Sequence, residues 1–429
     1  MFKKEEKSAI NRRGFLKTVG AAGIGTALVS TRLFADSTPS ASSGQAAAKD
    51  ANTAAKDPNA VKEQRAIPMR EFGNKGFKVP ACSLGVMFDA EANTAVLRKA
   101  LQLGVTFWDC AYAYGNGKSE SGIGIILKEQ PELRKKLIIT SKSGGTPEEL
   151  ENHLQESLKR MNTDYIDVYY GVHGLDNPAD LTDELKKWAE GAKKRKLIKY
   201  FGFSTHSNMA DNLTAAAKAG WIDAITTTYN FRVMQDPKMN DAVEACNKAG
   251  VALIAMKMQA KRQPAEKETP KEKEVMEYFT RKGFTEGQAK IKAVLQDKRI
   301  CSACIGVGRG NIEHLITDVD AVLDERELSK KDLAFLAEHA KKTCDGYCAG
   351  CASICAAASP DMPYVADVMR YLMYYNGYRD AEMAKQNYAG LPADARAKMI
   401  SADYSLAESR CPNRLPIAKL VKEAARKLA

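Results

Sequence analysis

The stretch KLIITSKSGGTPEELENHLQESLKRMNTDYIDVYYGVH (136–173) contains two short apolar runs separated by a polar segment. The end runs are rich in β-branched and aromatic residues, as strands are, and the segment between them is long enough for a helix. Strands joined through a helix lie parallel, because a tight turn can only reverse the chain. This stretch therefore predicts a strand–helix–strand unit.

Six further runs of the same kind lie on both sides of this stretch, with amphipathic helical patterns between them, for example at 181–196 and 236–250. Eight strand-then-helix units predict a closed parallel (β/α)8 TIM barrel, an α/β fold. The segment 69–81 has turn residues at its centre and predicts a hairpin that closes the bottom of the barrel. The polar run 261–274 predicts a surface loop. The eight runs are 81–87, 105–109, 136–142, 165–173, 198–205, 224–230, 251–258 and 302–308.

The composition allows a large core and argues against nucleic-acid binding. The chain has 429 residues, 45% of them hydrophobic, and a formal charge of +11. Its basic residues lie on Lys-rich helix faces without interleaved aromatic residues, a pattern that favours solvated faces. The length predicts two domains, or one barrel with an appendage, and we expect no nucleic-acid partner.

The N-terminus differs in character from the rest of the chain. Residues 11–17, NRRGFLK, precede a weakly apolar stretch and resemble a twin-arginine export signal, which we place at 1–35. The apolar stretch is too short and glycine-rich for a good membrane span, so we expect none after processing. Residues 36–66 have the composition of a disordered linker. The resemblance implies that the twin-arginine translocation machinery exports the folded protein to the periplasm.

Four titratable residues follow neighbouring strands of the predicted barrel. Asp109, Lys142 and His173 end the second, third and fourth runs, and Tyr114 lies just beyond Asp109. The chemistry of such barrels takes place where strands end and loops begin. An Asp, a Tyr, a Lys and a His that converge on one mouth predict a catalytic site rather than isolated structural residues.

These residues also carry a resemblance to a known family. The segment FWDCAYAYGNGKSESGIGIIL (107–127) resembles the Asp-Thr-Ala-x-x-Tyr-Gly signature of the aldo-keto reductases, with Cys110 in place of Thr. LIITSK and DYIDVYYGVHGLD match the segments with the family's lysine and histidine, and the resemblance covers residues 67 to about 325. It implies an NAD(P)H-dependent oxidoreductase that interconverts a carbonyl and an alcohol in a small substrate.

The four residues have complementary roles in such a reaction. Tyr114 donates a proton to the carbonyl oxygen as negative charge develops there. Lys142 is expected to lower the pKa of Tyr114, because a neighbouring ammonium favours the phenolate. Asp109 keeps Lys142 charged and oriented, and His173 orients the carbonyl oxygen.

Hydride must come from a nicotinamide cofactor, because no side chain supplies one. The resemblance implies that NADP(H) or NAD(H) lies extended across the barrel mouth. A glycine-rich turn after the eighth strand leads into a helix N-terminus and predicts a phosphate site, where Arg309 favours NADPH. The predicted cofactor-binding residues are Ser204, Tyr229 and Asn230 beside the nicotinamide ring, and Gly306, Gly308, Arg309 and Asn311 in the phosphate turn.

A cysteine cluster lies beyond the barrel, in CDGYCAGCASIC (344–355). Export favours disulfides, and a zinc site would need all four thiols from one short loop. The spacing is one residue longer than the bacterial ferredoxin run C-x2-C-x2-C-x3-C-P, which binds iron–sulfur clusters. These three alternatives remain open on spacing alone.

Two further segments, 369–380 and 408–424, resemble the C-terminal region of a bacterial aldo-keto reductase subfamily with ferredoxin-like cysteine motifs. This resemblance implies a helical domain over residues 326–429 that holds one 4Fe–4S cluster. Because a nicotinamide transfers two electrons as hydride, a cluster accepts one at a time and no flavin motif is visible, we expect the cluster to be structural. A non-catalytic electron-transfer or redox-sensing protein with a periplasmic redox partner is the alternative function. The predicted ligands are Cys344, Cys348, Cys351 and Cys411, and in the alternative set Cys355 replaces Cys411.

Overall fold

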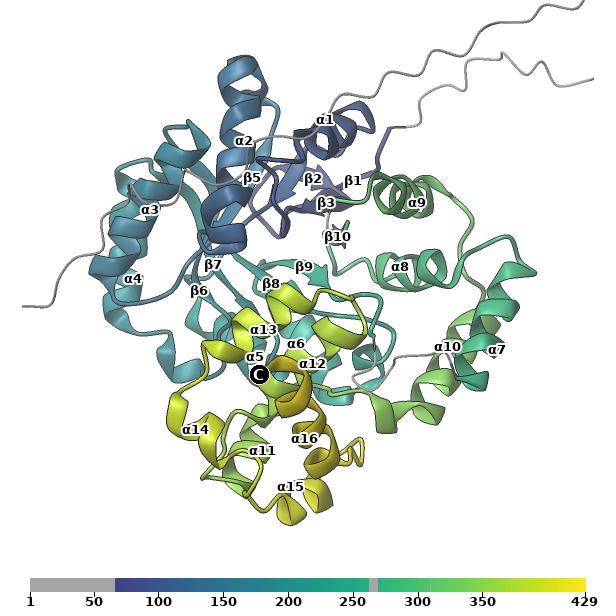
Figure 1. Ribbon diagram of the computed structural model, residues 1–429. Helices are drawn as coiled ribbons and strands as arrows, with labels where there is room; N and C mark the ends of the chain where they lie inside the picture. The colour runs from purple at the N-terminus through teal and green to yellow at the C-terminus, as the bar shows by residue number, and fades with distance from the viewer. Residues whose placement is uncertain (1–65, 262–268, 309) are drawn as a thin grey trace, which may run out of the picture. The chain divides into compact units, whose positions relative to one another are not determined.

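The computed structural model describes residues 66–261, 269–308 and 310–429 (Figure 1). The predicted export signal and nearly all of the predicted linker lie outside these residues, so both stay predictions.

Eight parallel strands form a closed barrel in the order β10-β3-β4-β5-β6-β7-β8-β9. Each predicted run contains one strand, so the barrel prediction is confirmed. Because all strands are parallel, their C-terminal ends open at one mouth. The strands are β3 (Cys82–Gly85), β4 (Phe107–Asp109), β5 (Ile138–Lys142), β6 (Ile166–His173), β7 (Ile198–Thr205), β8 (Ala224–Thr228), β9 (Ala252–Met256) and β10 (Ser302–Gly306).

The predicted hairpin is also present, as β1 (Met69–Glu71) paired antiparallel with β2 (Lys78–Pro80). Its turn packs against the chain before β9, where the Asn74 amide donates to the Gly250 carbonyl over 3.2 Å. Gly73 has φ +55°, and a Cβ there would lie 2.3 Å from the Gly250 oxygen. This close approach requires glycine.

Helices surround the barrel between successive strands. One of them corrects the sequence analysis, because α7 (Pro270–Thr280) begins within the run 261–274 that was predicted as a loop. Thr269 and Glu272 cap each other's backbone and Pro270 occupies the first helical position, which together start a helix in a polar sequence. The other helices are α1 (Thr94–Gln102), α2 (Lys118–Glu129), α3 (Pro147–Met161), α4 (Asp183–Lys194), α5 (Met209–Ala219), α6 (Pro237–Lys248), α8 (Glu286–Gln296) and α9 (Ile312–Leu323).

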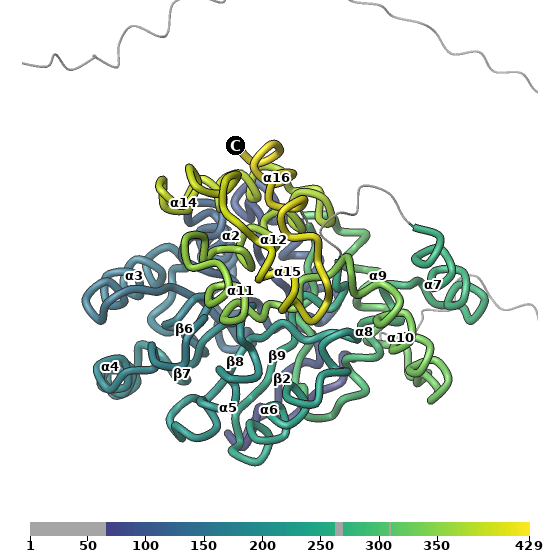
Figure 2. The backbone as a smooth tube through the Cα atoms, turned by 90° about the horizontal axis from the view of Figure 1, so that it is seen from below, coloured from purple at the N-terminus to yellow at the C-terminus, as the bar shows by residue number. Residues whose placement is uncertain are grey.

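Of the C-terminal helices, α11 to α16 lie on the side of the strands opposite the hairpin, and therefore at the barrel mouth, whereas α10 lies beside α7 (Figure 2). Met362, Met369, Leu372 and Leu420 belong to a second hydrophobic core there, whereas Leu336 of α10 packs with the barrel core. The domain boundary at 325 stays a prediction. These helices are α10 (Lys330–Lys342), α11 (Ala352–Ala358), α12 (Val365–Asn376), α13 (Ala381–Ala389), α14 (Ala393–Lys398), α15 (Ser405–Arg410) and α16 (Ile417–Leu428).

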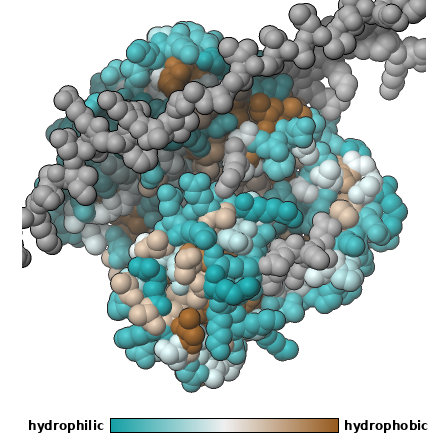
Figure 3. Space-filling model, viewed as in Figure 1, coloured by the Kyte–Doolittle hydropathy of each residue, from teal (hydrophilic) through white to brown (hydrophobic). Residues whose placement is uncertain are grey.

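The face of the molecule in Figure 3 is mainly hydrophilic, with small separate hydrophobic areas. No helix within the described ranges 66–261, 269–308 and 310–429 is long and apolar enough to cross a bilayer.

Candidate active site

A buried ion pair lies at the ends of β4 and β5. The Nζ of Lys142 donates to Oδ2 of Asp109 over 2.6 Å, and also to the Cys110 carbonyl over 2.8 Å. The other carboxylate oxygen of Asp109 accepts from the Thr140 hydroxyl over 2.6 Å. Burial alone would lower the pKa of Lys142, but attraction to Asp109 outweighs it and raises that pKa above its usual value. Lys142 is therefore a fixed ammonium at the barrel mouth.

Tyr114 lies next to this ion pair, in the short helix η1 (Tyr114–Gly117). The Nζ of Lys142 is 5.1 Å from the centre of its ring, and the imidazole of His173 contacts the ring edge-on at 5.6 Å between centroids. The structure thus brings together all four predicted residues, Asp109, Tyr114, Lys142 and His173, which we call the mouth cluster.

The pKa of Tyr114 differs from the sequence expectation. Burial raises the pKa of this phenol, and Asp109 adds to the increase, so the opposing effect of Lys142 does not lower it below its usual value. The free-energy cost of a phenolate among protein atoms exceeds the stabilisation that the Lys142 ammonium provides. Tyr114 consequently holds its proton firmly near neutral pH.

His173 ends β6, where its side chain is accessible to solvent at the mouth although many protein atoms and three cations lie nearby. The pKa of His173 is lowered to about 3, first by burial among protein atoms and then by the charges of Lys142, Arg370 and Lys257. Its imidazole is therefore neutral near pH 7 and can hydrogen-bond to a carbonyl oxygen without carrying charge.

Helix α12 contributes residues to this mouth that the sequence analysis did not assign. Lys257, directly after β9, lies over the rings of Tyr374 and Tyr378 at 4.5 and 5.1 Å. Tyr374 is close enough to raise the pKa of Tyr114 slightly. A resemblance at 369–380 was noted in the sequence, but no signal there placed these side chains at the mouth.

The residues predicted to flank the nicotinamide ring divide into two groups. Ser204 is buried at the end of β7, and its hydroxyl accepts from the Gly174 amide over 3.1 Å. The Tyr229 hydroxyl instead donates to Asp297 over 2.6 Å, and the Asn230 amide donates to the Tyr347 hydroxyl over 3.0 Å. The polar groups of Tyr229 and Asn230 are therefore bonded within the fold, and the predicted contacts of these two residues with the nicotinamide ring stay predictions.

The predicted phosphate turn lies between β10 and α9. Gly306 and Gly308 are exposed, and a Cβ at either would meet nothing within 4 Å, so a ligand can approach this backbone closely. Asn311 caps α9, and its side chain accepts from the Glu313 amide over 2.8 Å. Asn311 therefore stabilises the helix start, whereas Arg309 lies outside the described residues.

The family model of the aldo/keto reductase family matches residues 81–301. The chain belongs to the aldo/keto reductase family. Aldo-keto reductase yakc [NADP(+)] of fission yeast is 32% identical over 213 residues, which are 44% of this chain and 60% of that protein. L-glyceraldehyde 3-phosphate reductase of Escherichia coli is 33% identical over 158 residues, 32% of this chain and 45% of that protein. The chain thus spans about half the length of these two relatives.

Solved structures agree on the fold. An aldo-keto reductase from Bacillus halodurans in its holo form aligns with TM-score 0.53 and 19% identity, covering 64% of this chain and 96% of that one. An aldo-keto reductase from Klebsiella pneumoniae in complex with NADPH aligns with TM-score 0.52 and 20% identity, covering 64% and 95%. The family match ends at residue 301, so the cysteine-rich C-terminal region lies outside it.

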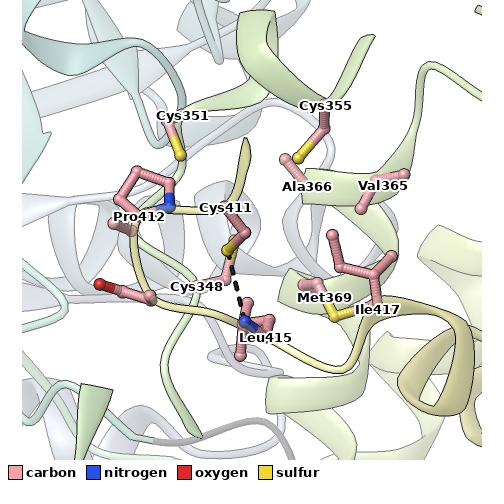
Figure 4. A pocket seen from close by; sticks show the side chains of 12 residues that line it. Cys348, Cys351, Cys355, Val365, Ala366, Met369, Cys411, Pro412, Leu415 and Ile417 are labelled. Carbon is pink, nitrogen blue, oxygen red and sulfur yellow. Dashed lines mark hydrogen bonds between the residues drawn. The ribbon is translucent and has the colours of Figure 1, made fainter. Parts of the chain in front are cut away.

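Four cysteines of this aldo/keto reductase line one small pocket, shown in Figure 4. Three come from the segment 348–355, and the fourth, Cys411, approaches from the loop between α15 and α16. The remaining wall is largely apolar and includes Val365, Met369 and Ile417. The sulfurs of Cys351 and Cys355 point into the space between these residues, and Cys411 Sγ accepts from the Leu415 amide over 3.4 Å. We call Cys348, Cys351, Cys355 and Cys411 the four-cysteine pocket.

Cys344, which the sequence places in the predicted ligand set, does not line this pocket. It lies in the short helix η5 (Cys344–Gly346) and lines a neighbouring groove. The adjacent Tyr347 is hydrogen-bonded to Asn230, and Arg232 Nη1 donates to the Thr343 carbonyl over 3.3 Å. These contacts hold η5 against the barrel, while Cys355, expected to be left over, faces the pocket.

The thiols are free in the structure, and among its described residues no three His, Cys, Asp or Glu side chains are placed to hold a single metal ion. An iron–sulfur cluster needs a different ligand geometry from a single metal ion. Each thiolate binds a separate iron, so the four sulfurs surround a larger volume. Four thiols around an apolar space, with an amide donating to one sulfur, match that donor set.

Proposed function

We propose that this chain is an NADPH-dependent oxidoreductase that interconverts the carbonyl and the alcohol of a small substrate. The observation that carries the proposal is the buried Asp109–Lys142 pair, at 2.6 Å, beside Tyr114 and His173 at the barrel mouth. The names of the relatives support it, since one contains NADP(+), another is a reductase, and a similar solved structure contains NADPH.

In this proposal Tyr114 holds the proton that the carbonyl oxygen receives. Its raised pKa keeps the phenol protonated near neutral pH, and the adjacent Lys142 ammonium stabilises the phenolate left after transfer. Asp109 keeps Lys142 charged and fixed, and neutral His173 orients the carbonyl oxygen. NADPH, when bound, supplies the hydride; Ser204 and the exposed turn at Gly306 and Gly308 would hold it, with Arg309 the predicted contact to its phosphate.

The activity is tested directly with purified protein, NADPH and a set of simple aldehydes and ketones. We expect NADPH oxidation that depends on the carbonyl compound, together with formation of the matching alcohol. Binding of NADPH without consumption by any carbonyl would instead favour the non-catalytic alternative. One observation favours this electron-transfer or redox-sensing alternative. Cys348 lines both the four-cysteine pocket and a cavity at the barrel mouth, so the two sites adjoin.

We further propose that Cys348, Cys351, Cys355 and Cys411 bind one 4Fe–4S cluster, as the donor set of their pocket favours. The cluster would link the loop 348–355 to the loop that carries Cys411, and so stabilise the C-terminal core. Protein prepared without oxygen should contain about four irons per chain. Replacement of Cys355 or Cys411 by Ser should remove most of this iron, whereas Cys344→Ser, the matched control, should retain it. Loss in Cys344→Ser with retention in Cys355→Ser would restore the set predicted from sequence.

Export to the periplasm by the twin-arginine route is proposed from NRRGFLK alone. Changing Arg12 and Arg13 together to Lys should leave the precursor in the cytoplasm. Normal periplasmic accumulation of that variant would contradict the assignment.

A further inference from the structure

A second cavity lies beside the mouth cluster, between the barrel and the C-terminal helices. The barrel supplies residues that directly follow or end strands β7, β8 and β9, namely His206, Thr228 and Lys257. The opposite wall comes from Arg370 and Met373 of α12 and from Tyr378 just beyond it. Its empty space is about 460 Å³, the open side included. We call it the cationic cavity, for the reason that follows.

Three cations line this cavity, Lys257, Lys261 and Arg370. Among the described carboxylates, only Asp367 lies within ion-pair distance of any of them, and it pairs with Arg370. Among the described residues, these cations therefore outnumber the carboxylates that pair with them. Cations held close together around a partly open cavity repel one another, and an anion between them relieves this repulsion.

The position of Lys257 is fixed by the fold. Its backbone has φ +59°, which is uncommon for a residue other than glycine, and its carbonyl accepts from Asn230 Nδ2 over 3.2 Å. Its ammonium lies over the rings of Tyr374 and Tyr378 rather than against a described carboxylate. This arrangement keeps the charge in place without neutralising it.

The cavity and the mouth cluster are electrostatically connected. Arg370 and Lys257 both contribute to the low pKa of His173, after burial and Lys142. Burial lowers the pKa of His206, whose Nδ1 lies 2.9 Å from the Thr228 hydroxyl, and Lys257 and Arg370 lower it further. A molecule with its carbonyl at Tyr114 and His173 therefore lies within the field of Arg370 and Lys257.

We propose that Arg370 and Lys257 bind an anionic group, a carboxylate or a phosphate, of a molecule that reacts at the mouth cluster. This proposal rests on the proposed function and deepens it, because it assigns the substrate class as carbonyl compounds that carry an acid group. A phosphate of the bound cofactor has the same chemistry and is the other source that the experiment must separate. Arg370 belongs to α12, outside the matched family segment, so this part of the site comes from the C-terminal region.

The test compares 4-carboxybenzaldehyde with benzaldehyde, which differ by one carboxylate. Arg370→Gln and Lys257→Gln should each lower kcat/KM for the carboxylated aldehyde by about tenfold or more relative to benzaldehyde, as loss of a charge-assisted hydrogen bond predicts. Arg370→Lys should restore part of the preference. Arg426→Gln, on the exposed face of α16, is the matched control and should keep the wild-type ratio. Unfolding midpoints verify that each variant folds.

Fluorescence titration with NADPH separates the two sources of the anion. We call kcat/KM for 4-carboxybenzaldehyde divided by kcat/KM for benzaldehyde the aldehyde ratio. If a variant has an unchanged Kd for NADPH but a lower aldehyde ratio, the anionic group belongs to the substrate. A weakened Kd with an unchanged ratio keeps the anion site but assigns it to a cofactor phosphate. No change in either quantity in both variants would overturn the proposal.

A failure of the proposed function gives a different pattern. If the wild type reduces neither aldehyde, calorimetric titration with benzoate tests the anion-binding site independently of catalysis. Benzoate binding that is lost in Arg370→Gln supports the anion site, and absence of binding to the wild type rejects it.

Discussion

Removal of the Lys142 charge should destabilise the protein unless the Asp109 charge is removed as well. The two side chains are 2% and 9% exposed and lie 2.6 Å apart. Lys142→Met leaves a buried carboxylate whose remaining side-chain donor at short distance is Thr140, 2.6 Å away. Breaking a buried pair on one side costs about 3–5 kcal/mol. Because Thr140 still stabilises the carboxylate, we expect a loss near the lower limit, about 3 kcal/mol.

The double variant Asp109→Asn, Lys142→Met removes both charges. We expect it to be more stable than Lys142→Met by at least about 2 kcal/mol, because no uncompensated charge remains buried. Urea unfolding followed by tryptophan fluorescence measures both losses. Arg195→Met is the matched control, since Arg195 and its partner Glu151 are 47% and 31% exposed and such pairs contribute at most about 1 kcal/mol. Additive losses in the double variant would refute the argument, because they would mean that the two charges do not interact.

Two further predictions concern the packing around the mouth. Burial, then Arg232 and Lys290, lower the pKa of His339 to about 4, so stability should fall as pH decreases from about 6.5 to about 4. His339→Gln should remove up to about 3 kcal/mol of that decline in urea unfolding between these pH values, and an unchanged pH profile would contradict this. Gly350 has φ +78°, and a Cβ there would lie 2.2 Å from the His206 carbonyl. Gly350→Ala should therefore loosen the 348–355 segment and speed its cleavage in limited proteolysis, whereas Gly191→Ala, with open space around it, should not.

The barrel could be predicted because each of its strands and helices is recognisable from the residue pattern of a short segment. Apolar runs of strand length recur at regular spacing, and each strand end defines a position at the mouth. The sequence therefore predicts that Asp109 and Lys142, at the ends of neighbouring strands, lie at the same mouth. The pKa of Tyr114 could not be predicted in this way, because its direction depends on burial as well as on the nearest charge.

The C-terminal region shows why the rest of the site needed the structure. Cysteine spacing does not reveal that Tyr347 is hydrogen-bonded to Asn230, 117 residues earlier, or that Cys411 lines one pocket with Cys348, Cys351 and Cys355. The position of Arg370 over the mouth likewise depends on packing between α12 and the ends of β7 to β9. No periodicity within either segment encodes such a long-range contact.

In the proposed reaction Tyr114 transfers a proton to a carbonyl oxygen, and turnover by Tyr114→Phe tests this step most directly. The substitution removes one hydroxyl and keeps the ring that contacts His173 and Lys142. We expect kcat for carbonyl reduction to fall by about two to four orders of magnitude, the usual contribution of a positioned general acid, while the NADPH Kd stays near the wild-type value. Carbonyl reduction by Tyr114→Phe at a rate close to the wild type would contradict the account.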